Sequence, residues 1–362
     1  MTSVWKFSLV IGPEINSTDF LFVELSHVTS THDTIRRGVH RTPATPYWFW
    51  FTVRVEYRLL DGGMHPSHRE KSCGMEPKAG FNFDALVPPE MALKAEELGI
   101  RKANLDFTRT FVLAVLAGAF IALGAAFSTT VATGTAEAPY GWSRLLVGLS
   151  FSIGLVLVVV GGAELFTGNN LIVMAWASGR VSTARLLRHW AIAYLGNFVG
   201  AAATAVVIFA SGQYGFAGGS VGDTALSIAN AKTSLPFVQA IVLGILCNAL
   251  VCLAVWLSYS ARSTSDKILA VFPPITAFVA MNFEHSIANM YFIPIGLLVK
   301  AGAPESFWVG IGKTAASYPE LNVSHFLANN LLPVTLGNVI GGAALVGLVY
   351  WFVFRRDSTE SS

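Results

Sequence analysis

The stretch NFEHSIANM, residues 282 to 290, places a glutamate, a histidine and two asparagines inside a segment that is otherwise apolar enough for the middle of a lipid bilayer. The apolar segment around it, from about 269 to 299, is too long for one simple helical crossing. Polar and ionisable residues are costly in hydrocarbon, so they usually mark a solute path or a break in a helix. The stretch therefore predicts an interrupted helix in a membrane protein.

The composition of the whole chain points to a multi-pass membrane protein. Of its 362 residues, 53% are hydrophobic and only 13% are charged. About six stretches after residue 106 are long and apolar enough to cross a bilayer. They lie near 108 to 132, 143 to 178, 187 to 211, 236 to 259, 269 to 299 and 324 to 354. We predict an all-α integral membrane fold with interrupted second and fifth helices.

Basic residues in the short loops predict the orientation in the membrane. In a six-span chain, one side carries Arg101, Arg180, Arg262 and Arg355, whereas the opposite loops are poorer in arginine and lysine. We therefore place both termini in the cytoplasm and the protein in the inner (plasma) membrane. The net charge of +2 gives no reason to expect a nucleic-acid partner. The three cysteines imply no disulfide.

Residues 1 to 74 differ in character from the rest of the chain. Segments such as WKFSLVIG (5 to 12) and YWFWFTVRVEY (47 to 57) are strand-like and aromatic, yet each is too short to span a bilayer. Three interpretations are open: an accessory β segment, an interfacial aromatic patch, or upstream sequence wrongly included before a true start at Met75. We favour the last, which makes this region extra to the fold or disordered.

The remainder divides into three predicted parts. Residues 75 to 106 contain VPPEMALKAEELGIRKA, in which Pro88 and Pro89 can open an amphipathic helix at the cytoplasmic surface. Residues 107 to 356 form the six-span domain, and residues 357 to 362 form a cytoplasmic tail.

Two pairs of motifs indicate an internal repeat. ELFTGN (164 to 169) and EHSIAN (284 to 289) both begin with glutamate and end with asparagine. Downstream of them, LGNFVGAA (195 to 202) and LGNVIGGAA (336 to 344) each contain a Gly-x-x-x-Gly pair, which lets helices approach closely. Two halves of three spans have opposite topology, so the repeat is inverted. Paired broken helices of this kind build the solute path in many transport proteins.

Two kinds of role are open for the ionisable residues at these breaks. For Glu164 and Glu284 we favour a structural role, in which each carboxylate holds backbone N–H groups that the broken helix frees. For His285 a core histidine is the alternative, but its depth in the membrane favours a place on the pathway.

The motifs GAELFTGN, GILCNALVCLAVW, SYSARSTSDK, FEHSIANMYFIP and LLPVTLGNVIGG make the chain from about Met75 to Arg356 resemble the formate/nitrite transporter family. Members of that family are pentamers with an aquaporin-like fold and one pore in each protomer, and they conduct small monovalent anions. The resemblance implies a homopentamer in the lipid bilayer that carries formate, with nitrite or hydrosulfide as alternatives. It implies neither a cofactor nor a metal.

The resemblance also implies which residues line the polar part of the pore. His285 matches the central pore histidine, and Thr167 matches the threonine that bonds to it. Asn248 and Asn289 match polar pore residues, which we expect to donate hydrogen bonds to the solute together with Thr167. Lys232, in the loop before the fourth span, matches the lysine that draws anions toward the pore.

Two apolar constrictions are implied in the same way. Phe278 and Leu165 match the pair on the cytoplasmic side. Phe151 and Phe166 match the aromatics of the outer constriction, where Val251 matches a further narrowing position. The chain departs from the family pattern before FEH, where Met281 and Asn282 replace small residues.

The sequence leaves two mechanisms open at His285. The imidazole either donates a hydrogen bond to a passing anion or gives it a proton, so that the neutral acid crosses. Burial favours neutral imidazole, whereas an arriving anion favours imidazolium. One rival function is an aquaporin-type channel for neutral solutes, although the paired Asn-Pro-Ala signatures are missing. The other is a membrane-embedded enzyme using Glu164, Glu284 and His285, for which facing metal ligands or a catalytic triad are missing. We predict no enzymatic activity.

Overall fold

The computed structural model describes residues 4–6, 26–28, 85–135 and 137–356. Contacts divide the chain into two units, Met1–Glu76 and Pro77–Ser362. In the first unit, β1 (Val4–Lys6) pairs with β2 (Ser26–Val28) in an antiparallel ladder. The aromatic stretch 47 to 57 lies outside the described residues, so the interpretations of residues 1 to 74 stay predictions.

The described part of the second unit is helical, and five of its segments are long and apolar enough to cross a membrane. These are α2 (Phe107–Ala132), the pair α3 (Tyr140–Phe151) and α4 (Ile153–Gly161), α6 (Thr183–Ala210), α8 (Phe237–Ser260) and the C-terminal segment His325–Phe354. The C-terminal segment consists of η5 (His325–Leu331), α12 (Leu332–Val339), η6 (Ile340–Leu348) and α13 (Val349–Phe354). The predicted all-α membrane architecture is confirmed.

The second and fifth predicted crossings are interrupted, as the sequence predicts. Beyond α4 the chain leaves the helix before η1 (Gly168–Ile172) and α5 (Val173–Ala177). Likewise, α9 (Thr264–Ala280) stops a few residues before α10 (Ser286–Gly302). The chain then bends by 110° into α11 (Glu305–Ile311), and α10 with α11 counts as a sixth candidate crossing.

Each break begins with a residue in the left-handed backbone conformation. Gly162, with φ +73°, ends α4, and Asn282, with φ +61°, follows the end of α9. Glycine adopts this conformation without strain, and asparagine tolerates it better than most other residues. Two residues later, the backbone N–H groups of Glu164 and Glu284 no longer bond within their own helices. They donate instead to carbonyls of α2 and α8, respectively. Asn282, a departure from the family pattern, therefore ends α9 in the way that Gly162 ends α4.

Glycines allow the neighbouring spans to pack backbone against backbone. A Cβ at Gly200 on α6 would overlap the carbonyl oxygen of Val115 on α2. A Cβ at Gly341 in η6 would in the same way overlap the carbonyl oxygen of Ile245 on α8. The predicted close packing at the two Gly-x-x-x-Gly pairs is confirmed, and it sets α2 against α6 and α8 against the C-terminal segment.

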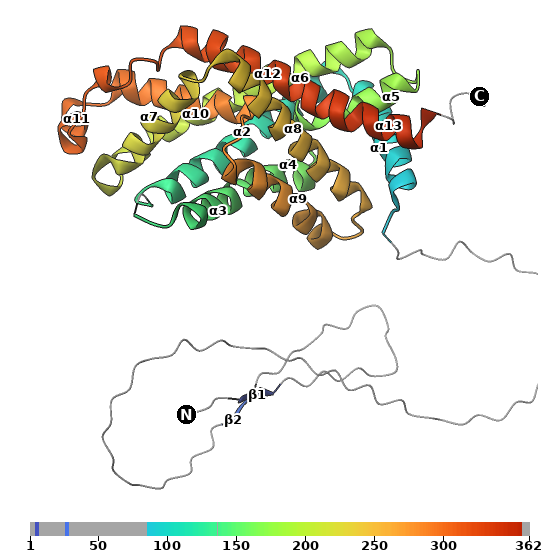
Figure 1. Ribbon diagram of the computed structural model, residues 1–362, viewed down its shortest axis with the longest axis horizontal. Coiled ribbons are helices and arrows are strands. Elements are labelled where there is room, and N and C mark those ends of the chain that lie inside the picture. Colours follow the sequence, from blue (N-terminus) through green and yellow to red (C-terminus); the bar gives the residue numbers. More distant parts are fainter. Residues whose placement is uncertain (1–3, 7–25, 29–84, 136, 357–362) are drawn as a thin grey trace, which may run out of the picture. The chain divides into compact units, whose positions relative to one another are not determined.

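Two shorter helices lie at opposite ends of the helical unit. The first is α1 (Pro88–Ala103), which opens with two prolines as predicted and packs against α5 and α13. The second is α7 (Ser220–Thr233), which packs against α10. Figure 1 shows α1, α5 and α13 at one end and α7, α10 and α11 at the other. Short 3₁₀ turns complete the α7 end: η2 (Gln213–Gly215), η3 (Ala217–Gly219) and η4 (Ala315–Ser317).

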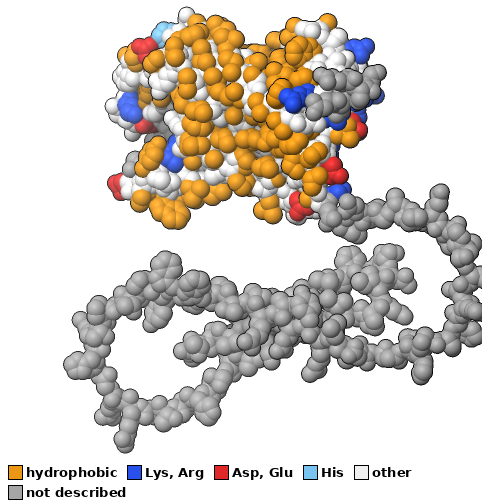
Figure 2. Space-filling model, turned by 45° about the vertical axis from the view of Figure 1, so that its right-hand side comes forward, with side chains coloured by type: hydrophobic (Ala, Val, Ile, Leu, Met, Phe, Trp, Pro, Cys, Tyr) orange, Lys and Arg blue, Asp and Glu red, His pale blue; other side chains and the backbone are white. Residues whose placement is uncertain are grey.

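Hydrophobic side chains cover most of the face shown in Figure 2, and charged side chains gather toward its margins. Large apolar residues such as Leu116, Val206 and Leu336 are exposed on the candidate spans. A surface of this extent is unfavourable in water but suits contact with lipid or with apolar faces of other subunits.

Candidate functional site

A cluster of four side chains, which we call the first clamp, holds the first break together. Its members are Lys102, Glu164, Asn169 and Asn197. The Lys102 ammonium lies 3.0 Å from both carboxylate oxygens of Glu164, and Asn169 Nδ2 donates to one of them at 2.7 Å. Asn197 donates to the backbone carbonyls of Ala114 and Glu164 and accepts from a backbone N–H of the break. The clamp thus satisfies backbone groups that the interrupted helix frees.

The second clamp repeats this arrangement with Lys232, Glu284, Asn289 and Asn338. Lys232 Nζ lies 2.8 Å from Glu284 Oε1, and Asn289 Nδ2 donates to Glu284 Oε2 at 2.7 Å. Asn338 donates to the carbonyls of Gly244 and Glu284, and its Oδ1 accepts from a backbone N–H at 2.9 Å. The two carboxylates accept from lysine and asparagine side chains and not, as the sequence predicts, from backbone N–H groups; the backbone N–H groups of the breaks bond instead to Asn197 and Asn338.

A single hydrogen bond joins the two breaks. Thr167 from the first break and His285 from the second approach to 2.9 Å between Oγ1 and Nε2, and both side chains are buried. His285 is the N-cap of α10, and its Nδ1 accepts the backbone N–H of Ala288 at 3.0 Å. Because Nδ1 accepts, the proton of the neutral ring lies on Nε2, and Nε2–H donates to the threonine hydroxyl.

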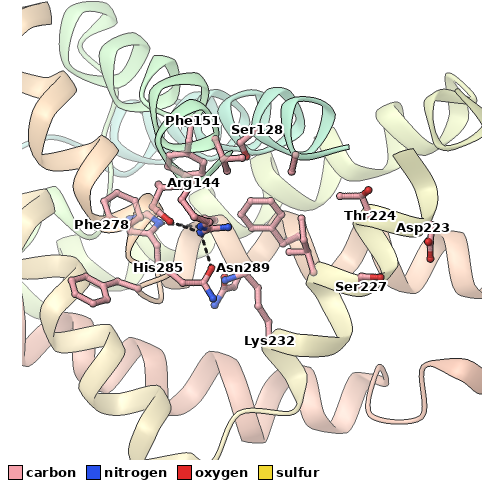
Figure 3. A pocket seen from close by; sticks show the side chains of 18 residues that line it. Ser128, Arg144, Phe151, Asp223, Thr224, Ser227, Lys232, Phe278, His285 and Asn289 are labelled. Atoms are coloured by element: carbon pink, nitrogen blue, oxygen red, sulfur yellow. Dashed lines mark hydrogen bonds between the residues drawn. The ribbon is translucent and has the colours of Figure 1, made fainter. Parts of the chain in front are cut away.

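On one side of this bond lies a cavity of about 270 Å³, which we call the α7-side pocket. Figure 3 shows its labelled side chains, with Phe151, Phe278 and His285 at one end and the polar residues of α7 at the other. The rings of Phe151 and Phe278 meet edge to face, with centroids 5.6 Å apart, and Phe278 stacks on the imidazole of His285. The phenyl pair therefore lies directly beside the buried imidazole.

On the other side lies the α1-side pocket, a cavity of about 410 Å³. Its apolar wall includes Leu155 and Leu165, which are each 2% exposed. Its polar wall includes several cations, among them Lys94 and Lys102. Burial, followed by the neighbouring charges of Lys267 and Arg262, lowers the pKa of Lys94. The Thr167–His285 bond thus lies between two cavities, both of which have basic side chains in their walls.

The structure corrects the predicted pairing of the constriction residues. Phe278 was grouped with Leu165, but Phe278 lines the α7-side pocket together with Phe151, whereas Leu165 lines the α1-side pocket. Phe166 lines neither cavity, because its ring packs against Trp190 and Tyr194. The pairing that the family resemblance implied is therefore wrong, because the two side chains line different cavities.

A further expectation needs correction. The sequence predicts that Asn248 and Asn289 donate to the solute, but their N–H groups already bond to protein. Asn248 Nδ2 donates to the carbonyls of Thr167 and Asn338 and to Asn170 Oδ1, so it positions the threonine. Asn289 belongs to the second clamp. Val251 is 1% exposed and lines neither cavity, so its role in narrowing the pore stays a prediction.

Lys232 lies on the last turn of α7 and not in a loop. Its ammonium is bound to Glu284 and lies 5.4 Å from the centre of the Phe292 ring. The side chain is 14% exposed and lines the α7-side pocket. Lys232 therefore contributes to this pocket as one half of an ion pair and not as an isolated charge.

Sequence reasoning missed four residues of the site. Leu155 lies one helical turn after Phe151, and this spacing was its signal. Lys102 is the counterpart of Lys232 on the other short helix. Asn197 and Asn338 stand in the two LGN motifs, and their signal is that both motifs repeat the asparagine together with the glycine.

A comparison with protein families gives one match of direct relevance. The family model described as "Formate/nitrite transporter" matches residues 89–352, which include both breaks, both clamps and both short helices.

Curated relatives and solved structures agree with this match. The formate channel FocA of Escherichia coli (strain K12) is 45% identical over 281 residues, covering 78% of this chain and 99% of the relative. The formate channel FocB of the same strain is 38% identical over 76% of this chain and 98% of its own length. The structure "Pentameric formate channel with formate bound" is 45% identical, has a TM-score of 0.66, and covers 68% of this chain and 97% of its own. A second structure, "FNT family ion channel", is 28% identical with a TM-score of 0.62, and covers 73% and 98%.

Proposed function

Because the chain belongs to the formate/nitrite transporter family, we propose that it conducts small monovalent anions, formate first, through a pore in each protomer of a homopentamer. Its relatives are channels and transporters, several of them named for formate. We further propose that it resides in the inner (plasma) membrane with the α1 end in the cytoplasm. The lysines and arginines of the α1-side pocket support this orientation.

The observation that carries the proposal is the buried Thr167–His285 hydrogen bond, because His285 lines the α7-side pocket and Gly168, the residue after Thr167, lines the α1-side pocket. A carboxylate is strongly disfavoured in hydrocarbon unless donors replace its water. Since His285 donates to Thr167 Oγ1, the threonine keeps its own proton for a further acceptor. The oxygen of a passing formate is such an acceptor, and a chain of hydrogen bonds polarises each of its members.

The pathway has three stages. In the α7-side pocket, Arg144 raises the local concentration of anions, and Lys232 contributes as one half of its ion pair with Glu284. Between the rings of Phe151 and Phe278 the ion loses water, and hydrated cations are excluded. After the central bond, the ion passes Leu155 and reaches the α1-side pocket.

The geometry at His285 favours hydrogen bonding over proton transfer. An imidazolium carries a proton on each ring nitrogen, so Nδ1 could no longer accept from Ala288 N–H. Proton transfer to the solute therefore requires loss of the N-cap bond of α10. In the resting arrangement His285 acts as a donor to Thr167, and the anion crosses in its charged form.

Formate uptake into proteoliposomes that contain the full chain tests this function. Nitrite and hydrosulfide are compared at acid and neutral pH, and glycerol uptake serves as the control for neutral solutes. We expect saturable formate flux and no glycerol flux. Vesicles that take up glycerol but no anion would overturn the proposal.

Replacing His285 by Asn tests the central bond. Loss of a hydrogen bond of about 1.4 kcal/mol should lower the rate about tenfold. Thr167→Val is the matched variant, since it removes the hydroxyl with little change in volume, and we expect the same loss. A His285→Asn protein with an unaltered rate and pH dependence would contradict any role of His285. A pH dependence lost together with the rate would instead indicate proton coupling.

A further inference from the structure

The α7-side pocket contains one group that an anion path should avoid. Asp223, near the start of α7, is the single acidic residue among the described residues that line this cavity. Its side chain is 30% exposed. Figure 3 places it with Thr224 and Ser227 on α7, at the opposite end of the pocket from His285. An incoming anion therefore meets this carboxylate before it reaches the phenyl pair.

Two residues from the segment after α11 cover the carboxylate. The Lys313 ammonium lies 2.6 Å from Oδ1 and 2.8 Å from Oδ2 of Asp223. The Tyr318 hydroxyl donates to Oδ1, and its ring lies under the ammonium, 5.7 Å from Lys313 Nζ to the ring centre. Both carboxylate oxygens are therefore engaged by donors from one short stretch of chain.

The charge states of the covering groups are stable. Hydrogen bonding to Asp223 raises the pKa of Lys313 above its usual value, so the ammonium keeps its charge throughout the neutral range. Burial, together with the nearby carboxylate, raises the pKa of Tyr318, so the phenol keeps the proton that it donates. Neither group titrates at a pH at which formate transport is measured.

We propose that Lys313 and Tyr318 mask the negative charge of Asp223 and thereby set how readily anions gain access to the α7-side pocket. This inference rests on the proposed function. Without Lys313, the bare carboxylate would oppose the attraction from Arg144, whereas Lys232 is already paired with Glu284. The alternative is purely mechanical, in which the ion pair only anchors the segment after α11 to α7. The two alternatives predict different results for Asp223 itself.

The test compares formate uptake at low and high ionic strength for four variants of the full chain. Lys313→Met removes the masking charge, Asp223→Asn removes the masked one, and the double variant removes both. Glu305→Gln is the matched control, because Glu305 is an exposed acid on α11 that does not line the pocket. Recovery of folded oligomer is measured for each protein.

Masking makes a distinct prediction for each variant. Lys313→Met lowers uptake roughly threefold at low ionic strength, and salt removes most of the loss because an exposed charge is screened. Asp223→Asn raises uptake at low ionic strength, since Lys313 is then uncompensated. The double variant returns toward the parent rate, and Glu305→Gln matches the parent.

Other results would overturn the inference. If Lys313→Met and Asp223→Asn lower uptake alike and the double variant recovers nothing, the ion pair is an anchor only. If Lys313→Met leaves uptake unchanged at low ionic strength, the masking is irrelevant to access. Failure of the parent protein to carry formate would instead count against the proposed function, so the two failures are distinguishable.

Discussion

Nearly identical clamps hold the two breaks of this protein, but the residues between the clamp positions differ. In each clamp one glutamate is bound by a lysine from a short helix and by the asparagine five residues after that glutamate. The asparagine of an LGN motif bonds to the backbone of the break. Between these repeated positions the first break carries Thr167 and the second carries His285, and neither residue recurs at the matching place. Residues that repeat hold the backbone, whereas the two residues that differ form the hydrogen bond that joins the breaks.

The clamps also differ at one supporting position. His189 on α6 lies 2.9 Å from Asn169 Nδ2 and 3.4 Å from the Glu164 carboxylate. In the second half Asn330 occupies this place, accepting from Asn289 and donating to Glu284. The first clamp therefore has a third ionisable group that the second lacks. A variant in one half can therefore be compared with the matching variant in the other half as its control.

The largest expected effect comes from the asparagines that tie down the backbone. Asn197→Leu and Asn338→Leu each leave two buried carbonyls and one buried N–H without their side-chain partner. At about 1–3 kcal/mol for each unsatisfied group, either change should cost at least about 3 kcal/mol and lower the midpoint of thermal unfolding by roughly 5–10 °C. Thermal denaturation of the purified protein measures both. Equal losses of stability would show that both clamps hold the backbone in the same way. A loss for only one of the two variants would contradict this.

The sequence revealed the repeat but not the whole of either clamp. ELFTGN and EHSIAN share their end residues, so both breaks could be predicted, whereas the pathway role of His285 stays a prediction. The two lysines were not matched, because they lie on short helices whose separation from the breaks depends on loop length. The sequence predicts a loop at Lys232, whereas this residue lies on the last turn of α7.

The constrictions show a second limit of the sequence. Side-chain depth along a regular helix follows from its constant rise, but an interrupted helix resets that register. Phe278 precedes its break by one turn, and its partner across the pocket, Phe151, lies more than a hundred residues earlier. Only the folded structure brings the two together.

The clamp lysines should give the next largest effect, and an unequal one. Lys232→Met leaves the Glu284 carboxylate, which is 3% exposed, without a cation. In the first clamp Lys102 is 28% exposed and Glu164 is 5% exposed, so water partly replaces the lost cation in Lys102→Met. Breaking a buried pair from one side costs about 3–5 kcal/mol, so Lys232→Met should destabilise the protein by about that amount and Lys102→Met by less.

Formate flux and thermal denaturation of the purified variants measure this difference. Equal losses would show that the greater exposure of Lys102 makes no difference, and would remove this distinction between the two halves.

The smallest effect is expected for the exchange that makes the first clamp resemble the second. In His189→Asn, the shorter amide can donate to Glu164 as Asn330 donates to Glu284, so the ion pair with Lys102 persists. The loss should be about 1 kcal/mol or less, with formate flux retained, because His189 lines neither pocket. The reverse change, Asn330→His, adds volume at a fully buried position and removes the bond to the Lys232 carbonyl, so it should cost more. If His189→Asn instead abolished flux, the imidazole would have a role beyond the clamp, and the proposed solute path would have to include it.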